Sequence, residues 1–484
     1  MSDVTYLGLD LGTSSVKAVL TDGAGRLLGQ AGAGYALASP QPGHADIDPE
    51  QWWTATVAAV SELSPSAAAP PRAIGLSGQM HGVVLTDPAG RATRPAVLWP
   101  DTRAVEHLER YAELPAAMRE RQRNPLSPGM AGPILSWLQE HEPATLAAAR
   151  WALQPKDWLR LRLTGDVAGD PSDASATLLY DVPGEQWDRE LCRALGIDDG
   201  LLPPLAPSAA VGGALLPAAA AALGLPVGTP VAIGAADTAA AALGSGLRDP
   251  GQVQLTLGTG GQLVAPSSQA RGRPESGTHL YRAATSAGWY AMAATLNAGL
   301  VLDWVRSSLA ASWDELYAAA GVRPDDPYFV PHLAGERTPY LDPGLRAGWV
   351  GLGLDHDRQT MLRVTLEGVA HAVRDAFDAL PDAHDVETIR IAGGGSRHPG
   401  FRQLLADVLE RSLHAVDTPA ASARGAALLA AVAVGDLTED DVFGPLAPHV
   451  TPAAQPRPGT AELHRRRLGR FRELVARGAT VAPQ

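Results

Sequence analysis

The stretch Tyr6-Leu7-Gly8-Leu9-Asp10-Leu11-Gly12-Thr13-Ser14-Ser15, close to the N-terminus, decides the fold. Its leucines alternate with Gly8, Asp10 and Gly12, which is the two-residue period of a β-strand, so Asp10 lies on the face opposite to the leucines. Gly12, Thr13 and Ser14 then offer backbone amides and hydroxyls that can bind an anion. We expect a strand, a phosphate-binding turn and a second strand between Tyr6 and Asp22. An ordinary hairpin with a polar turn is the alternative.

Asp10 needs a cation to stand beside a phosphate. A carboxylate repels bare phosphate, so we expect Asp10 to be a partner of phosphate-bound Mg²⁺, directly or through a water molecule.

Residues 252–263 repeat this pattern and run into Leu257-Gly258-Thr259-Gly260-Gly261. The two Gly-Thr pairs stand about half of the 484-residue chain apart, which indicates an internal duplication into two related lobes. Gly258, Thr259 and Gly260 would then bind phosphates from the side of a shared cleft opposite to Gly12. The two lysines of the chain, Lys17 and Lys156, do not follow a glycine, which excludes a G-x-x-x-x-G-K loop.

A third glycine-rich segment lies near the C-terminus. Residues 388–392 read as a short buried strand, and Gly393-Gly394-Gly395-Ser396 leads into a helix with apolar residues on one face. Glycines at a helix N-terminus permit close approach of a nucleotide, and the helix dipole favours its negative charge. A plain strand-to-helix turn is the alternative.

Asp237 stands between Gly234-Ala235-Ala236 and an alanine-rich stretch that reaches Leu243. We therefore expect Asp237 to cap a helix whose N-terminus stabilises its ionised form. An ordinary structural N-cap is the alternative to a catalytic role.

Four segments together resemble the FGGY family of carbohydrate kinases, and the match runs nearly end to end. These segments are Gly8–Ser14, Ser77–Gly82, the region of Gly234 to Gly244, and Gly393–Ser396. Further similar pieces are 48–53, 98–101, 155–162, 172–174 and 335–339. Within the family, Gln79-Met80-His81-Gly82 resembles the members that phosphorylate D-xylulose. The resemblance implies an α/β fold of two actin-like (ribonuclease H-like) domains around a deep cleft, in which ATP meets a ketopentose.

The resemblance also implies roles for single residues. Asp237 is the general base and Asp10 the second catalytic carboxylate, in a reaction that converts D-xylulose to D-xylulose 5-phosphate. Met80 and His81, in a loop between two strands, contact the sugar, and Asp101 and Arg103 complete the hydroxyl contacts. Two positions depart from the family pattern: Thr238 replaces an asparagine and Gly260 a serine. A kinase for a related ketose or polyol, and an actin-like nucleotide-binding protein or sugar-responsive regulator, are the alternatives.

The organisation of the chain suggests two domains, 1–246 and 247–484. Gly244, Gly246, Pro250 and Gly251 end one helix before the repeated hairpin begins. Residues 91–230 are interpreted as insertions that build the sugar side of the cleft, and residues 465–467 as part of a solvated terminal helix.

Composition narrows the classes of function. The net charge of −13 and the absence of a basic stretch argue against nucleic acid and anionic membrane surfaces as partners. The N-terminal residues do not resemble a signal peptide, and Cys192 is the sole cysteine, which fits a cytoplasmic protein. The sequence is compatible with a homodimer and does not fix the oligomeric state.

Overall fold

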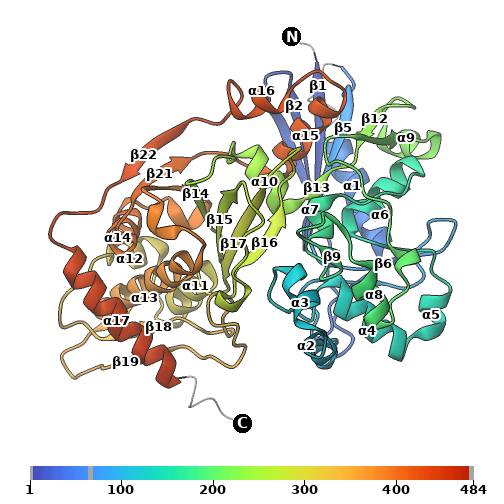
Figure 1. Cartoon of the computed structure of the whole chain (residues 1–484). Coiled ribbons are helices and arrows are strands. Elements are labelled where there is room, and N and C mark those ends of the chain that lie inside the picture. Colours follow the sequence, from blue (N-terminus) through green and yellow to red (C-terminus); the bar gives the residue numbers. More distant parts are fainter. Residues whose placement is uncertain (1–3, 64–68, 479–484) are drawn as a thin grey trace.

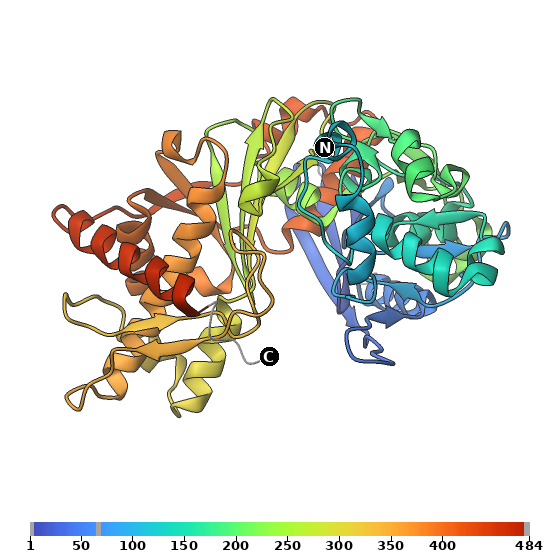
Figure 2. The ribbon, with the colours of Figure 1, turned by 60° about the horizontal axis from the view of Figure 1, so that its bottom comes forward.

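The computed structural model describes residues 4–63 and 69–478 and contains two lobes, each built on a mixed β-sheet. Figures 1 and 2 show the lobes, coloured blue to green and yellow to red, joined where helices α10 (Asp237–Gly244) and α15 (Ala421–Ala433) lie. No helix in these ranges is both long and apolar enough to span a membrane.

The first sheet has the predicted hairpin near its centre. Within the described residues it is seven-stranded, in the order β11-β12-β5-β1-β2-β3, and β13 pairs additionally with β5. Strands β1 and β2 pair antiparallel and β1 pairs parallel with β5, so the predicted strand, turn and strand are confirmed. The strands are β1 (Thr5–Leu11), β2 (Ser15–Asp22), β3 (Leu27–Gly34), β5 (Ala73–Gly78), β11 (Val211–Ala214), β12 (Pro230–Ala232) and β13 (Ala235–Ala236).

The second sheet repeats this topology. Its order is β16-β17-β15-β14-β20-β21-β22, again seven-stranded over the described ranges, with β14 antiparallel to β15 and parallel to β20. The second hairpin is thereby confirmed, and the shared order fits the predicted internal duplication. Its strands are β14 (Val253–Leu257), β15 (Gly261–Ser267), β16 (His279–Arg282), β17 (Trp289–Thr295), β20 (Thr388–Ala392), β21 (Ser412–Val416) and β22 (Val450–Ala454).

Helices and short strand pairs surround the sheets. The first lobe has α1 (Pro49–Leu63), α2 (Leu108–Ala112), α3 (Ala116–Gln122), α4 (Ala131–His141), α5 (Pro143–Ala147), α6 (Pro155–Thr164), α7 (Pro171–Ala174), α8 (Arg189–Leu195) and α9 (Pro217–Leu223). After α10 the chain forms α11 (Gly299–Ser308), α12 (Trp313–Ala318), α13 (Arg358–Ala379), α14 (Pro399–Leu409), α16 (Glu439–Phe443) and α17 (Ala461–Gly478). The short pairs are β4 (Asp46–Ile47) with β7 (Ala96–Val97), β6 (Val84–Thr86) with β8 (Trp151–Leu153), β9 (Tyr180–Asp181) with β10 (Gln186–Trp187), and β18 (Tyr328–Val330) with β19 (Gly348–Val350).

Helix α15 belongs to the second half of the chain but packs on the first sheet (Figure 1). Glycines make this approach possible, because a Cβ on Gly8 would lie 1.9 Å from Ala423 O and one on Gly75 would lie 1.7 Å from Ala426 O. The helix contacts α10 equally closely, since a Cβ on Gly425 would lie 1.9 Å from Ala240 O. The strand that carries Asp10 and the helix that begins at Asp237 thus pack against the same helix, α15.

Two local predictions are wrong. Ala236, rather than Asp237, occupies the N-cap of α10, and Asp237 is the first helical residue. In α17, Arg465 is exposed, but Arg467 is buried and pairs with Glu367 at 2.6 Å, so residues 465–467 are not all solvated.

Candidate active site

A cavity of about 790 Å³ opens between the lobes. Asp10, Asp237 and Thr238 line it from the first lobe, while Gly393 and Gly394 line it from the second. The structure therefore brings the two predicted catalytic carboxylates and part of the third glycine-rich turn to one ligand-sized space.

The sheet register places Asp10 beside the segment that leads to Asp237. On β5, Ser77 pairs with Asp10 on one side and with Ala235 on the other. The Ser77 hydroxyl donates to Asp10 Oδ1 at 2.7 Å, and no described group bonds to Oδ2. Asp10 thus keeps one carboxylate oxygen for a ligand.

The electrostatics of the two carboxylates differ from those of ordinary aspartates. Burial raises the pKa of Asp10, opposed by the Ser77 hydrogen bond and the charge of Lys17. The pKa of Asp237 is raised to about 7, first by burial and then by repulsion from Asp10. A carboxyl group with this pKa can accept a proton and release it near neutral pH, as a general base must.

Asp237 is also held by its neighbour. The backbone amide of Thr238 donates to Asp237 Oδ1 at 2.6 Å, and the Thr238 hydroxyl lies 3.1 Å from the same oxygen. Gln262 of β15 in turn donates to the Thr238 hydroxyl at 3.1 Å. Thr238, one of the two departures from the family pattern, therefore links the Asp237 carboxylate to the second lobe.

The first turn offers anion donors in the predicted place. Gly12 bonds internally to Ser15 O, while the amides of Thr13 and Ser14 bond to no other described group. Ser14 is exposed, and the Gly12 carbonyl accepts hydrogen bonds from the side chains of Tyr35 and Gln79. This turn is held at Gly12 and open at Ser14.

The second and third turns pack against each other. Gly393 has φ +87°, and a Cβ there would lie 2.4 Å from Leu257 O, next to the exposed residues Gly258 and Thr259. No described atom would lie within 4 Å of a Cβ on Gly258 or Gly394.

Two details of these turns differ from expectation. A Cβ on Gly260 would lie 2.5 Å from Thr295 O, so the backbone leaves no room for the serine of the family pattern. Gly394–Ser396 form a 3₁₀ turn before α14 begins at Pro399, so Gly393, Gly394 and Gly395 do not form the N-terminus of the α-helix. The backbone itself, rather than the dipole of α14, is what these glycines offer to an anion.

Comparisons with known proteins decide the family. The sequence matches the FGGY family of carbohydrate kinases, N-terminal domain, over residues 5–244, and the C-terminal domain of the same family over residues 253–434. The chain belongs to the FGGY family of carbohydrate kinases. A kinase of this family uses ATP as a substrate, which fits the two-lobed cavity.

Relatives within the family are similar over most of the chain. A xylulose kinase of Klebsiella pneumoniae is 37% identical over 450 residues, which covers 92% of both chains, and one of Escherichia coli is 35% identical over 88% of this chain and 90% of that protein. The crystal structure of a protein from Brucella ovis described as a xyloylose kinase superposes with a TM-score of 0.92 at 34% identity, over 99% of this chain and 100% of that one. These likenesses confirm the predicted two-domain, actin-like α/β class.

Met80 and His81, which are predicted to contact the sugar, lie close to the segment that leads to Asp237. Met80 is 5% exposed and belongs to the same apolar cluster as Ala236 and Tyr281. His81 has φ +78° and its Nδ1 donates to Ala176 O at 2.7 Å. Burial lowers the pKa of His81 to about 4, so the ring is neutral and Nε2 is a hydrogen-bond acceptor at pH 7.

Asp101 and Arg103 are engaged within the protein. Asp101 accepts from Ala45 N at 2.6 Å and pairs with Arg103 at 2.7 Å, and Arg103 continues to Asp46 at 2.5 Å. This network ties the β4–β7 pair together and leaves these groups occupied. Their contact with sugar stays a prediction, while their visible role is to support the neighbouring loop.

That loop carries Trp99, which is 36% exposed and whose Nε1 donates to Thr13 Oγ1 at 3.0 Å. Trp99 belongs to the piece 98–101 that resembles the family, and an aromatic residue there could either contact the sugar or pack in the interior. The exposed ring and its bond to the first turn argue against buried packing.

Sequence reasoning gave no roles to three residues of the second lobe that lie near His81, namely His279, Tyr281 and Arg337. Arg337 donates to His279 Nε2 at 3.1 Å, and the His279 ring stacks on Tyr281 with centroids 5.5 Å apart. The charge of Arg337 contributes to lowering the pKa of His81, after burial, and Asp237 is among the groups that raise the pKa of Tyr281. Arg337 stood in the similar piece 335–339, but nothing in that piece indicated which way it faces.

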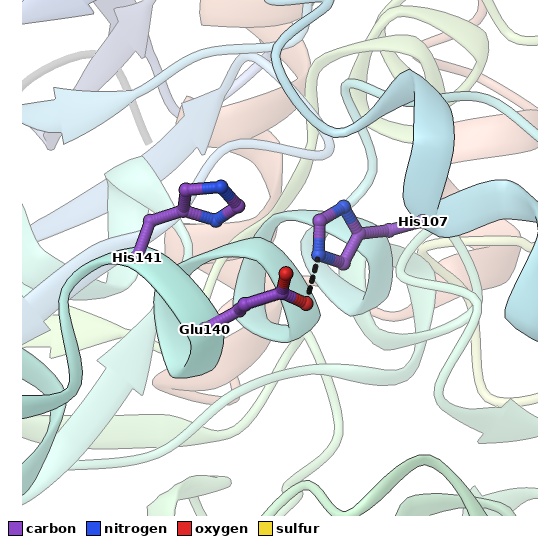
Figure 3. Close-up of side chains that lie close together, drawn as sticks. All are labelled: His107, Glu140 and His141. Carbon is purple, nitrogen blue, oxygen red and sulfur yellow. Dashed lines mark ion pairs between the residues drawn. The ribbon is translucent and has the colours of Figure 1, made fainter.

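A separate group of possible metal ligands lies elsewhere in the first lobe. His107, Glu140 and His141 offer ligand atoms within 4.8 Å of one another, and Figure 3 shows Glu140 and His141 on α4 facing His107. Arg110 already donates to Glu140 at 2.9 Å, so the carboxylate is paired with a fixed cation. The group does not line the cavity at Asp10, and we assign no part of the kinase chemistry to it.

Proposed function

We propose that this chain transfers the γ-phosphoryl group of MgATP to O5 of a ketopentose, D-xylulose, with Asp237 as the general base and Asp10 as the second catalytic carboxylate. The observation that carries the proposal is the raised pKa of Asp237, about 7, in a cavity between the lobes that Asp10 and the glycine-rich turn at Gly393 and Gly394 also line. The names of the relatives support D-xylulose as the acceptor.

The reaction asks little of the protein beyond alignment, charge neutralisation and proton removal. As O5 attacks the γ-phosphorus, its proton passes to the Asp237 carboxylate, the bond between the γ-phosphorus and the bridging oxygen breaks, and ADP leaves. Phosphorylation at O5 yields D-xylulose 5-phosphate.

The turns divide the phosphates between them in this proposal. The first turn, with Thr13 and Ser14, holds the transferred group, and the turns at Gly258–Gly260 and Gly393–Gly395 hold the rest of the triphosphate from the second lobe. Arg397 and Arg402, which line the cavity, add positive charge there.

Mg²⁺ fits Asp10, because no described group bonds to its Oδ2 and because the charge of Asp10 raises the pKa of the nearby Asp237, so that a cation close to these carboxylates is favoured. When bound with ATP, Mg²⁺ would neutralise phosphate charge. Asp10 would hold this ion and thereby orient the phosphates.

On the sugar side, Met80 supplies an apolar wall and the neutral His81 accepts a hydrogen bond from a sugar hydroxyl. The same proposal includes contacts from Asp101 and Arg103, which would require the network with Asp46 to rearrange. A cytoplasmic location is part of the proposal, and the buried free thiol of Cys192 agrees with it. The two domains are proposed to divide at 246, although α15 crosses back to the first sheet.

An ADP-release assay over a panel of pentuloses, hexuloses, polyols and glycerol tests this function. We expect the highest kcat/KM for D-xylulose, and phosphate at O5 of the product by NMR. A higher kcat/KM for another ketose or a polyol would replace the substrate but keep the reaction. The absence of sugar-dependent ADP release from every member of the panel would contradict the reaction itself.

A further inference from the structure

A cluster of buried charges lies behind the segment that carries Asp237. The ammonium group of Lys156, fully buried in α6, lies 2.7 Å from Asp157, 2.8 Å from Asp170 and 3.0 Å from Asp173. Arg160 adds a second buried cation, 2.8 Å from Asp157. Burying an ion costs several kcal/mol before it is paired, so such a cluster contributes little net stability. These residues are therefore expected to have another role.

The charges of this cluster are arranged so that Asp170 is an anion. Burial opposes ionisation of Asp170, but Lys156 and the hydrogen bonds from Ser172 and Ser208 outweigh it and hold the pKa below its usual value. Burial raises the pKa of Asp173 well above its usual range. Of these two carboxyl groups beside Lys156, Asp170 is therefore the one whose surroundings favour the anion.

A single hydroxyl connects this anion to the catalytic segment. Ser172 Oγ donates to Asp170 Oδ2 at 2.5 Å and accepts from the backbone amide of Ala236 at 2.9 Å. Donation to an anion polarises the hydroxyl and strengthens Oγ as an acceptor. Lys156, Asp170, Ser172 and Ala236 thus form one continuous chain that ends at the residue before Asp237.

The other end of the segment is held by the same cluster. Arg160 Nη1 donates to Ile233 O at 2.9 Å, and the amide of Gly234 donates to Ser208 O at 3.0 Å. The segment also lies tightly on β5, because Gly234 has φ +84° and a Cβ there would lie 2.3 Å from Leu76 O. Residues 233–236 have little freedom to move as long as these bonds persist.

We propose that Lys156, Asp170 and Ser172 are positioning residues of the kinase, which fix the Ala236 amide and thereby the direction of the Asp237 carboxylate. This inference rests on the proposed role of Asp237 as the general base. Phosphoryl transfer depends on alignment, and displacement of a reacting group by about 1 Å can cost roughly 100-fold in rate.

The chain offers a matched pair of serines for the test. Ser172 and Ser208 both donate to Asp170 Oδ2, at 2.5 and 2.8 Å, but only the hydroxyl of Ser172 also accepts from Ala236. Ser172→Ala should lower kcat by roughly 10- to 100-fold and change KM for sugar and ATP by less than about threefold. Ser208→Ala should lower kcat by less than about threefold, because the bond to Ala236 stays. Ser136→Ala, at a buried serine outside the cluster, controls for loss of a buried hydroxyl.

A double-mutant cycle with Asp237→Asn separates positioning from general damage. If Ser172 acts through the base, Ser172→Ala should lower kcat by less than about twofold more in the Asp237→Asn enzyme. Multiplicative losses, or equal losses for Ser172→Ala and Ser208→Ala, would overturn the inference.

Two further outcomes are distinguishable. Full kcat in Ser172→Ala with a large loss in Asp237→Asn contradicts the positioning role alone, whereas full kcat in Asp237→Asn contradicts the proposed base. Ser172→Cys keeps the volume but accepts hydrogen bonds weakly, so it should show the same loss of kcat as Ser172→Ala and replaces it if that variant does not fold.

Discussion

The buried charge of Asp237 should lower the free energy of unfolding at the pH at which the enzyme works. Asp237→Asn should remove this destabilisation. In the folded protein the pKa of Asp237 is about 7, against an ordinary value of 3.8, with burial as the main cause and Asp10 as the second. The folded state therefore binds this proton more tightly than the unfolded state. Between about pH 4 and pH 7 the free energy of unfolding falls as pH rises through this window, and above pH 7 the full cost is present.

The magnitude follows from the difference in pKa. About three pH units at about 1.36 kcal/mol each give an upper bound of about 4 kcal/mol. The carboxylate faces an open cavity where water screens it, so we expect about 2 kcal/mol. For lobes of this size that corresponds to a rise of about 4–8 °C in the unfolding temperature of the affected lobe at pH 8. At pH 5 the carboxyl group is neutral, and the variant should unfold close to the wild type.

Thermal unfolding at pH 5 and pH 8, without nucleotide or sugar, measures this difference. Asp357→Asn is the matched control, since Asp357 also stands at a helix start, accepts from Thr360 N at 2.8 Å, and has its pKa lowered by that bond. It should not stabilise the protein at pH 8. An Asp237→Asn variant that is equally shifted at both pH values, or less stable at pH 8, would refute the argument from the raised pKa.

Three other predictions concern ligands. Asp10→Ala should lower turnover severely and weaken its dependence on Mg²⁺ while the fold persists by circular dichroism, and near-normal turnover would remove Asp10 from the mechanism. His81→Asn tolerates the positive φ but lacks the imidazole Nε2 acceptor, so KM for D-xylulose should rise about 10-fold with KM for ATP unchanged in steady-state kinetics, and an unaltered sugar KM would contradict the contact. Saturating sugar should favour a closed arrangement of the lobes, visible as a smaller radius of gyration by X-ray scattering, and identical profiles with and without sugar would count against large-scale closure.

The hairpins could be predicted because strand alternation and glycine turns are local signals. Residues 6–22 and 252–263 formed the expected strands since their leucines and valines alternate with small or polar residues. The place of α15 could not be predicted, because its alanine-rich sequence carries no amphipathic stripe. That composition has its reason in three dimensions: the helix lies against β1, β5 and α10 at once, where larger side chains would not fit.

The differences between the structure and these local expectations also have physical causes. An aspartate before an alanine run is typical of an N-cap, but the extended segment that pairs with β5 ends at Ala236, so the helix begins one residue earlier than expected and Ala236 is the N-cap. The sugar contacts of Asp101 and Arg103 stay a prediction, and the structure adds that Arg103 pairs with Asp46, which the sequence did not indicate. The neighbouring arginines of Arg467 indicated a solvated side chain, but α17 packs so that Arg467 pairs with Glu367.

The central claim is that Asp237 removes the proton of the attacking hydroxyl. The most direct measurement is kcat of Asp237→Asn with D-xylulose and MgATP at pH 8, together with sugar affinity by calorimetry. We expect kcat to fall by roughly 10²- to 10⁴-fold while the sugar still binds, since asparagine keeps the size of the side chain and cannot accept the proton. Turnover above about a tenth of the wild-type value would contradict the account, because the contribution of a positioned base is far larger than that.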